Sequence, residues 1–366
     1  MLIQCTKKLL DQLKRKPAAD YEEEPLFSWH ANLITLNRRK TVVLMNNQNR
    51  YMIVLYGLKA KDFAKINELV LNAIRITFLE EGIREEIVER YIQQAPDITF
   101  SKTKDRASVS KLNQSCENVY FYEELLDGDS IVQPSLSMRT SRFLTGDGLQ
   151  PHSELYKDLE KFAGEPIFRF QAVQLKVKLA LEHHHVFRRL IVPLRFTFAQ
   201  LHELLQVAFG WKDKHLHEFY ILDEQNSSTF NLKGKNPIVK IVCDEEAFNF
   251  EDDIPLKHEN RTKLSDYLPK YKTLRYLYDF GDNWRHDIEI EKILHDYDKN
   301  YPVCLEGEGS TPPEDVGGEY GYEEFLKIIE DPSHPDFAHM ISWGGIDRGK
   351  GFDIAMVNRM LRSRLS

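Results

Sequence analysis

The sequence predicts an α+β protein of two domains, each a mainly antiparallel sheet packed with helices. At 366 residues the chain is longer than a single hydrophobic core commonly serves. Strand-like stretches joined by hairpin-length connections are interspersed with amphipathic helices, an order typical of α+β folds. Glycine and proline residues cluster between 145 and 166, and such a cluster is typical of a boundary between domains.

The first predicted domain covers residues 1–145. Turn-rich connections between its three expected strands predict an antiparallel meander. Apolar residues at helical spacing from Phe63 to Phe78 predict a long helix that Gly82 ends. The expected elements are, in order, one helix, three strands and three helices: 5–16, 28–36, 41–46, 51–58, 59–81, 84–94 and 105–126.

A linker with a short helix is expected over 146–166, and the second domain over 167–366. Its first strand is indicated by strict alternation, in which Val173, Leu175 and Val177 are separated by polar residues. Further strands are expected at 187–193, 215–222, 238–243, 273–280 and 284–294. Helices are expected at 198–209, 321–330, 335–342 and 354–362.

Negative charge is concentrated in one stretch of the second domain. Tyr278–Asp331 holds 16 acidic and four basic residues, a net charge of −12, whereas the whole chain carries −8. Charge packed so closely repels itself unless folding spreads it, pairs it or uses it. The stretch is therefore where we expect a functional surface.

Composition bounds the classes of protein that the chain can belong to. With 42% hydrophobic and 29% charged residues it has the composition of a soluble globular protein. Its longest apolar runs, such as Tyr51–Tyr56, fall far short of the about 20 residues of a membrane span, and the N-terminal residues do not form a signal peptide. The four cysteines form no C-x-x-C pair, so we expect a cytoplasmic protein without disulfides or a membrane partner.

Two histidines in the expected strand 215–222 are candidate metal ligands. His215 and His217 share one face of that strand and lie roughly 6.5–7 Å apart, a separation that allows both to bind one metal ion. Alternatively, one histidine lies on the surface and the other is hydrogen-bonded beside a core that contains Phe219. The sequence leaves both interpretations open.

Acidic residues in two connections supply candidate partners for this pair. Asp279 and Asp282 lie in a tight D-F-G-D-N turn between two strands, where glycine or asparagine is expected to take a positive φ. Glu314 and Asp315 lie in the glycine-rich loop Cys304–Gly321, whose carboxylates suit a hard cation, a basic partner or the capping of a helix. The expected groove is lined by His215, His217, Asp279, Asp282, Trp284, His286, Glu314 and Asp315. Within it, the candidate metal ligands are His215, His217, Asp279 and Asp282.

The chain lacks the motifs of several common classes of enzyme. The chain has no G-x-S-x-G, no Walker loop and no G-x-G-x-x-G, and Cys304 lacks a neighbouring group that would activate its thiol. The D-F-G sequence stands without the other motifs of protein kinases.

From about Phe168 to the C-terminus, the chain resembles the plasmid pRiA4b Orf-3-like family. The resemblance depends on seven motifs: FRRLIVP (187–193), AFGW (208–211), KHLHEF (214–219), YDFGDNWRHDIEIEKI (278–293), CLEGEGSTPPEDVGGEYGYEEF (304–325), DPSHPD (331–336) and FDIAMVNRML (352–361). It implies an α+β fold and an association with plasmids and mobile elements, and it brings no established activity. The preceding half resembles a bacterial domain of unknown function that accompanies this family.

The chain departs from the family pattern at three positions. Phe187 stands where the family usually has tryptophan. Thr311 and Val316 stand where cysteines are expected around the P-P-E-D loop, which leaves only Cys304. A thiolate-rich zinc site is therefore not expected in this chain.

Three hypotheses for function follow. The leading one is a non-enzymatic binding or accessory module whose acidic, aromatic-edged groove takes a basic protein surface or a small ligand. The second is a metal-dependent hydrolase that uses the same groove, with a divalent metal as its only candidate cofactor. The third is a nucleic-acid-handling accessory protein of a mobile element. Only the family context supports this hypothesis, because an acidic chain lacks the excess of basic residues that is typical of nucleic-acid binding.

Overall fold

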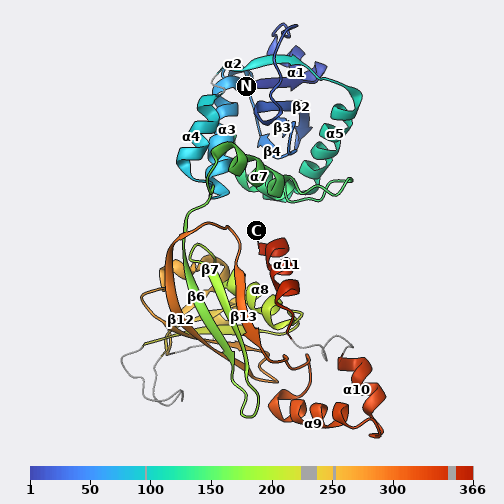
Figure 1. The fold of residues 1–366 in the computed structure, drawn as a ribbon. Helices are drawn as coiled ribbons and strands as arrows, with labels where there is room; N and C mark the ends of the chain where they lie inside the picture. The colour runs from blue at the N-terminus through green and yellow to red at the C-terminus, as the bar shows by residue number, and fades with distance from the viewer. Residues whose placement is uncertain (95–96, 224–236, 250–252, 345–351, 366) are drawn as a thin grey trace. The chain divides into compact units, whose positions relative to one another are not determined.

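The computed structural model describes residues 1–94, 97–223, 237–249, 253–344 and 352–365. The chain divides into two compact units, Met1–Phe168 and Arg169–Ser366 (Figure 1). Each contains a sheet packed with helices, of five strands in the first unit and eight in the second. The predicted α+β class with mainly antiparallel sheets is confirmed.

The sheet of the first unit has the strand order β4-β3-β2-β1-β5. Its strands are β1 (Leu2–Cys5), β2 (Ser28–Leu36), β3 (Arg39–Asn46), β4 (Met52–Leu55) and β5 (Thr99–Lys102). The antiparallel meander β2-β3-β4 was predicted. Strands β1 and β5 were not predicted. They pair in parallel with each other, and β1 also pairs in parallel with β2. Each has only four residues, too few for alternation to identify.

Helices flank this sheet, with α3 and α5 on either side of the strands in Figure 1. The helices are α1 (Lys7–Leu13), α2 (Ala60–Ala64), α3 (Ile66–Glu80), α4 (Glu85–Gln94), α5 (Arg106–Phe121), α6 (Pro134–Thr140) and α7 (Pro151–Ala163). The expected helix 59–81 is two helices, because Lys65 leaves helical geometry between α2 and α3. The helix expected inside the linker is α7, and its buried Leu155 and Leu159 place it within the first unit.

The sheet of the second unit has the strand order β10-β9-β8-β11-β12-β6-β7-β13 and is antiparallel except between β10 and β9. Its strands are β6 (Phe170–Leu179), β7 (Val186–Pro193), β8 (His217–Leu222), β9 (Pro237–Val242), β10 (Leu256–His258), β11 (Thr273–Tyr278), β12 (Trp284–Tyr297) and β13 (Val303–Glu308). Part of the stretch expected to be the loop Cys304–Gly321 is thus β13, which pairs with β7.

The helices of the second unit are α8 (Phe198–Phe209), α9 (Gly318–Glu330), α10 (Phe337–Gly344) and α11 (Ile354–Leu365). A capping box between Thr197 and Gln200 begins α8, and Gly210 ends it at φ 74°. Helix α11 contacts both α8 and β13, and Leu204 and Leu361 are fully buried in the core that they share with the sheet. None of the described helices is both long enough and apolar enough to cross a lipid bilayer.

Candidate functional site

Four of the predicted groove residues lie together, and we call them the His215 cluster: His215, Asp279, Glu314 and Asp315. The antiparallel pairing of β8 with β11 sets His217 opposite Tyr278. The residues just outside those two strands therefore lie side by side, and the N–H of Asp279 donates to the carbonyl of Leu216 at 3.0 Å. The loop after β13 brings the remaining two carboxylates to the same place.

The imidazole of His215 is surrounded by carboxylates. Its Nε2 lies 2.9 Å from Oδ1 of Asp315, 3.4 Å from Oδ2 of Asp279 and 3.7 Å from Oε2 of Glu314. This nitrogen is buried, and within the described residues no acceptor meets it with hydrogen-bond geometry. The close contacts are therefore electrostatic contacts rather than a directed hydrogen-bond network.

The turn after β11 fixes the orientation of Asp279. Its Oδ1 accepts hydrogen bonds from the N–H of Gly281 at 2.9 Å and of Asp282 at 3.2 Å, which leaves Oδ2 directed at His215. Asp279 and Asn283 adopt φ of 58° and 59°, so an aspartate as well as an asparagine takes the positive φ that was expected of glycine or asparagine. A left-handed aspartate is uncommon, and such backbone strain concentrates at functional sites.

Main-chain and phenol donors hold Glu314 in a buried position. Its Oε1 accepts from the N–H of Lys212 at 2.6 Å, and the hydroxyl of Tyr278 lies 3.2 Å from both carboxylate oxygens. Burial raises the pKa of Tyr278 above its ordinary value, so this phenol stays protonated and donates. The oxygen of Glu314 that faces His215 thus has a fixed position although Glu314 lies in a loop.

The donor atoms of the cluster are spaced as ligands of one cation. One nitrogen of His215 and one oxygen each of Asp279 and Asp315 lie within 4.8 Å of one another. Metal–ligand bonds near 2.1 Å set neighbouring ligand atoms about 3.4 Å apart in tetrahedral geometry and about 3.0 Å apart in octahedral geometry. The observed separations of 2.9 and 3.4 Å from His215 match these values.

His217 belongs to a different group. As the first residue of β8 it faces α8, where its ring stacks on that of His202 with 3.4 Å between centroids and 1° between planes. Its Nε2 lies 2.7 Å from Oε2 of Glu259, while Nε2 of His202 lies 2.9 Å from Oδ1 of Asp213. The two histidines that were expected to share one metal are thus divided, because His215 precedes the strand and His217 begins it.

Stacking makes the two imidazoles electrostatically unequal. Burial lowers the pKa of His202 to about 4, and the charge on His217 acts in the same direction. Burial also opposes the charged form of His217, but contacts with Cys243 and Glu259 outweigh it and raise its pKa to about 9. At neutral pH the pair therefore holds one positive charge, on His217.

Three other predicted residues lie outside the His215 cluster. Alternation along β12 turns Trp284 and His286 into the core, where His286 is fully buried and packs on Phe209 and Trp211 at 4.7 and 5.1 Å. Burial lowers the pKa of His286 to about 3. Neither ring forms an accessible groove wall. The carboxylate of Asp282 accepts a hydrogen bond from the N–H of Gly317 at 3.1 Å. It therefore holds the loop after β13 and is not part of the His215 cluster.

Sequence reasoning missed several residues that complete the site. Tyr278 is the first residue of the motif at 278–293, but only the fold shows that its hydroxyl contacts and orients Glu314. Leu216 and Phe280 are exposed apolar residues, each about half accessible, and they adjoin His215 and Asp279 in the chain. Their exposure is seen only in the folded chain, so the sequence carried no signal for either residue.

Comparison with known proteins gives matches for both units. The plasmid pRiA4b ORF-3-like protein family matches residues 171–360, and a domain of unknown function, DUF6933, matches residues 2–154. The uncharacterised protein y4hQ of Sinorhizobium fredii is 37% identical over 187 residues, which are 51% of this chain and 86% of that protein. The crystal structure of MM3350, a protein of unknown function from Methanosarcina mazei, has 35% sequence identity and a TM-score of 0.41, covering 50% of this chain and 96% of that one.

Proposed function

Since the chain belongs to the plasmid pRiA4b ORF-3-like protein family, and the matched segment contains the whole His215 cluster, we propose that the second unit is a binding module for a divalent metal ion. Nε2 of His215 and carboxylate oxygens of Asp279 and Asp315 are the proposed ligands, and Glu314 is a fourth. Mixed nitrogen and oxygen donors suit zinc, manganese or iron better than calcium.

One observation carries this proposal. Hydrogen bonds from the surrounding chain hold Oδ1 of Asp279 and both oxygens of Glu314. Oδ2 of Asp279 and Oε2 of Glu314 face Nε2 of His215, which has no hydrogen bond within the described residues. Metal ligands are oriented in this way, because hydrogen bonds from neighbouring groups fix each ligand while its donor atom keeps a lone pair for the ion. An ion pair that only stabilises the fold would instead have well-directed hydrogen bonds at its centre.

Charge supports the same proposal. Three carboxylates meet one imidazole, and Nζ of Lys214 lies 3.8 Å from Asp315, so acidic groups outnumber basic ones in the cluster. Glu314 and Asp279 are less than a tenth exposed, and burying like charges together is costly without a cation. A divalent ion offsets this repulsion, which is the physical reason to expect affinity.

Metal-dependent hydrolysis is the second candidate function. The observation that favours it is the exposure of Asp315, whose side chain is 54% accessible, so the cluster reaches solvent. A metal held at such a position supplies Lewis-acid chemistry for hydrolysis. If the protein is a hydrolase, Leu216 and Phe280 are the apolar residues beside which a substrate would lie.

The test compares metal binding by the full chain and by single-histidine variants. After treatment with a chelator, calorimetric titration with Zn²⁺ and Mn²⁺ is expected to give one site per chain in the unchanged protein. His215→Ala is expected to abolish it, because the only nitrogen ligand is lost. His295→Ala removes an exposed imidazole from β12 and is expected to bind as the unchanged protein does.

A second comparison separates this site from a His-x-His chelate. His217→Ala is expected to retain the metal and to lower stability, since His217 stacks on His202 and contacts Glu259. Equal binding by the unchanged protein and His215→Ala would contradict the proposal. The Zn²⁺-loaded protein is also assayed with p-nitrophenyl phosphate and p-nitrophenyl acetate. Turnover that is lost in His215→Ala would favour hydrolysis. If the loaded protein binds metal without turnover, the proposed function is metal binding only.

A further inference from the structure

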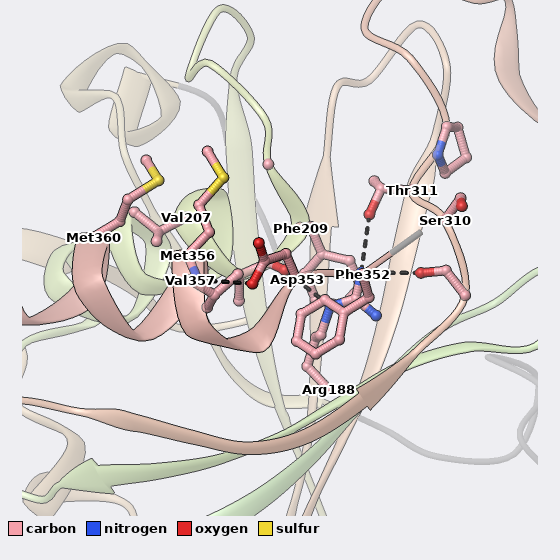
Figure 2. Close-up of a pocket in the computed structure, with 14 residues that line it drawn as sticks. Arg188, Val207, Phe209, Ser310, Thr311, Phe352, Asp353, Met356, Val357 and Met360 are labelled. Atoms are coloured by element: carbon pink, nitrogen blue, oxygen red, sulfur yellow. Dashed lines mark hydrogen bonds between the residues drawn. The ribbon is translucent and has the colours of Figure 1, made fainter. Parts of the chain in front are cut away.

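A second candidate site is a cavity of about 350 Å³ in the second unit. It lies between the end of α8, the start of α11 and the loop after β13 (Figure 2). One part of its wall is apolar, with Val207, Met356 and Met360 close together in the figure. The other part contains the guanidinium of Arg188 and the hydroxyls of Ser310 and Thr311. An apolar cavity with a few convergent polar groups is the usual form of a small-molecule site.

Arg188 is fixed by its surroundings. It is 2% exposed, and its guanidinium lies between the rings of Phe352 and Phe209, at 4.0 and 5.0 Å from their centroids. Its N–H groups donate to main-chain carbonyls at 2.7 to 3.1 Å. These carbonyls belong to Phe187, Ala208, Glu308 and Gly309.

Within the described residues, no carboxylate accepts a hydrogen bond from the guanidinium of Arg188. In the described part of the chain its hydrogen-bond acceptors are neutral oxygens, and burial lowers its pKa to about 10. Burying an unpaired charge is costly. Asp353 also lines the cavity, but none of the hydrogen bonds of Arg188 within the described residues goes to its carboxylate. One carboxylate oxygen of Asp353 caps α11 by accepting from the N–H of Met356 at 2.9 Å.

One donor of Arg188 is only weakly engaged. Its contact with Oγ1 of Thr311 is 3.4 Å long, at the edge of hydrogen-bond range. A ligand oxygen could take that N–H, and the hydroxyls of Thr311 and Ser310 could donate to the same ligand. Bonds in which both partners are charged are stronger than neutral ones.

We propose that this cavity binds a small organic monoanion, a carboxylate on an apolar aliphatic or aromatic body. The carboxylate lies against Arg188, Ser310 and Thr311, and the body packs among Val207, Met356 and Met360. Flexible, polarizable methionine side chains suit such a wall because they adapt to apolar ligands of different shapes. This site shares no ligand atom with the His215 cluster, so its test is independent of the metal.

The test uses the full chain labelled with ¹³C in the methyl groups of its seven methionines. The probes are 3-phenylpropionate and its neutral amide, which have nearly the same shape. Titration with the acid is expected to shift the signals of Met356 and Met360, assigned through Met356→Leu and Met360→Leu. The acid is expected to bind about tenfold more tightly than the amide, because only the acid pairs with the buried charge.

Variants separate charge recognition from apolar packing. Thr311→Val and Ser310→Ala remove hydroxyls from the cavity, and each is expected to reduce the preference for acid over amide several-fold while amide binding stays unchanged. Thr103→Val, in the first unit, is the control and is expected to have no effect. Equal affinity for acid and amide, no shift of either methionine signal at millimolar acid, or a preference unchanged in both variants would overturn the proposal.

Discussion

The two units each bury a cluster of charged side chains, and the clusters differ in how they are satisfied. In the first unit, Glu81 is fully buried yet accepts four hydrogen bonds: two from Arg142 at 2.8 and 3.0 Å, and one each from the hydroxyls of Tyr51 and Tyr156 at 2.6 and 2.7 Å. In the second unit, the His215 cluster has three carboxylates around one nitrogen that lacks a directed hydrogen bond.

This difference distinguishes a structural network from a candidate site. Burial would raise the pKa of Glu81, but Arg142 outweighs it and lowers the pKa below the ordinary value. The charge is thus stabilised by the protein itself. Tyr156 belongs to α7, so the same network fastens α7 to the core of the first unit. In the His215 cluster the compensation would have to come from a ligand.

The largest expected effect comes from Glu81→Gln. The change leaves the Arg142 guanidinium without a counter-charge, and breaking a buried ion pair in this way costs about 3–5 kcal/mol. Urea unfolding of the full chain is expected to show this loss for the first unit. Glu80→Gln, at the exposed neighbouring position, is the control and should change stability little.

The contribution of Glu81 also has a defined dependence on pH. Because its pKa is lowered in the folded state, its stabilisation is present above the unfolded pKa of about 4.5 and is lost as pH falls through the folded value. The gap in stability between the unchanged protein and Glu81→Gln should therefore narrow in acid. If the unchanged protein and Glu81→Gln differ by less than about 1 kcal/mol in free energy of unfolding at pH 7, the ion pair of Glu81 contributes no more than a surface pair. The contrast between the two units would then be wrong.

The stacked histidines are an intermediate case, with a smaller expected effect. The pKa of His217 is raised to about 9, so its contribution is fully present below the unfolded pKa near 6.5 and is lost as pH rises toward 9. The free energy of unfolding should fall over that window by about 3 kcal/mol. His217→Gln should abolish the fall, whereas an equal fall in the variant would assign it to other groups.

The sequence predicted much of the fold because apolar residues at buried positions recur with the period of a helix or a strand. Alternation identified β6, turn-rich connections predicted the meander β2-β3-β4, and capping residues located α8 between Thr197 and Gly210. The missed strands are β1, β5, β10 and β13, and β10 has only three residues. Strands β1, β5 and β13 gain their partners from distant parts of the chain. Pairing of that kind depends on tertiary context, which local patterns do not contain.

The candidate site was predictable in composition but not in arrangement. His215, Asp279, Glu314 and Asp315 were each singled out, since histidine and acidic residues in turns are typical of sites. Spacing along a strand could not show that β8 begins at His217, which separates the two histidines. Arg188 gave no signal because a basic residue in a strand is usually exposed, and the fold buries it.

The smallest expected effect on stability comes from Asp315→Asn, and it tests the comparison from the other side. In chelator-treated protein the change should alter the free energy of unfolding by no more than about 0.5 kcal/mol, because the Asp315 side chain is 54% accessible and its ion pairs with His215 and Lys214 lie at the surface. With Zn²⁺ or Mn²⁺ at a hundred times its dissociation constant, the unchanged protein should gain about 2.7 kcal/mol by mass action, and the variant much less. Asp298→Asn, an exposed change on the same unit, should keep the full gain. A loss of about 3 kcal/mol without metal would instead make the cluster a structural network like that of Glu81.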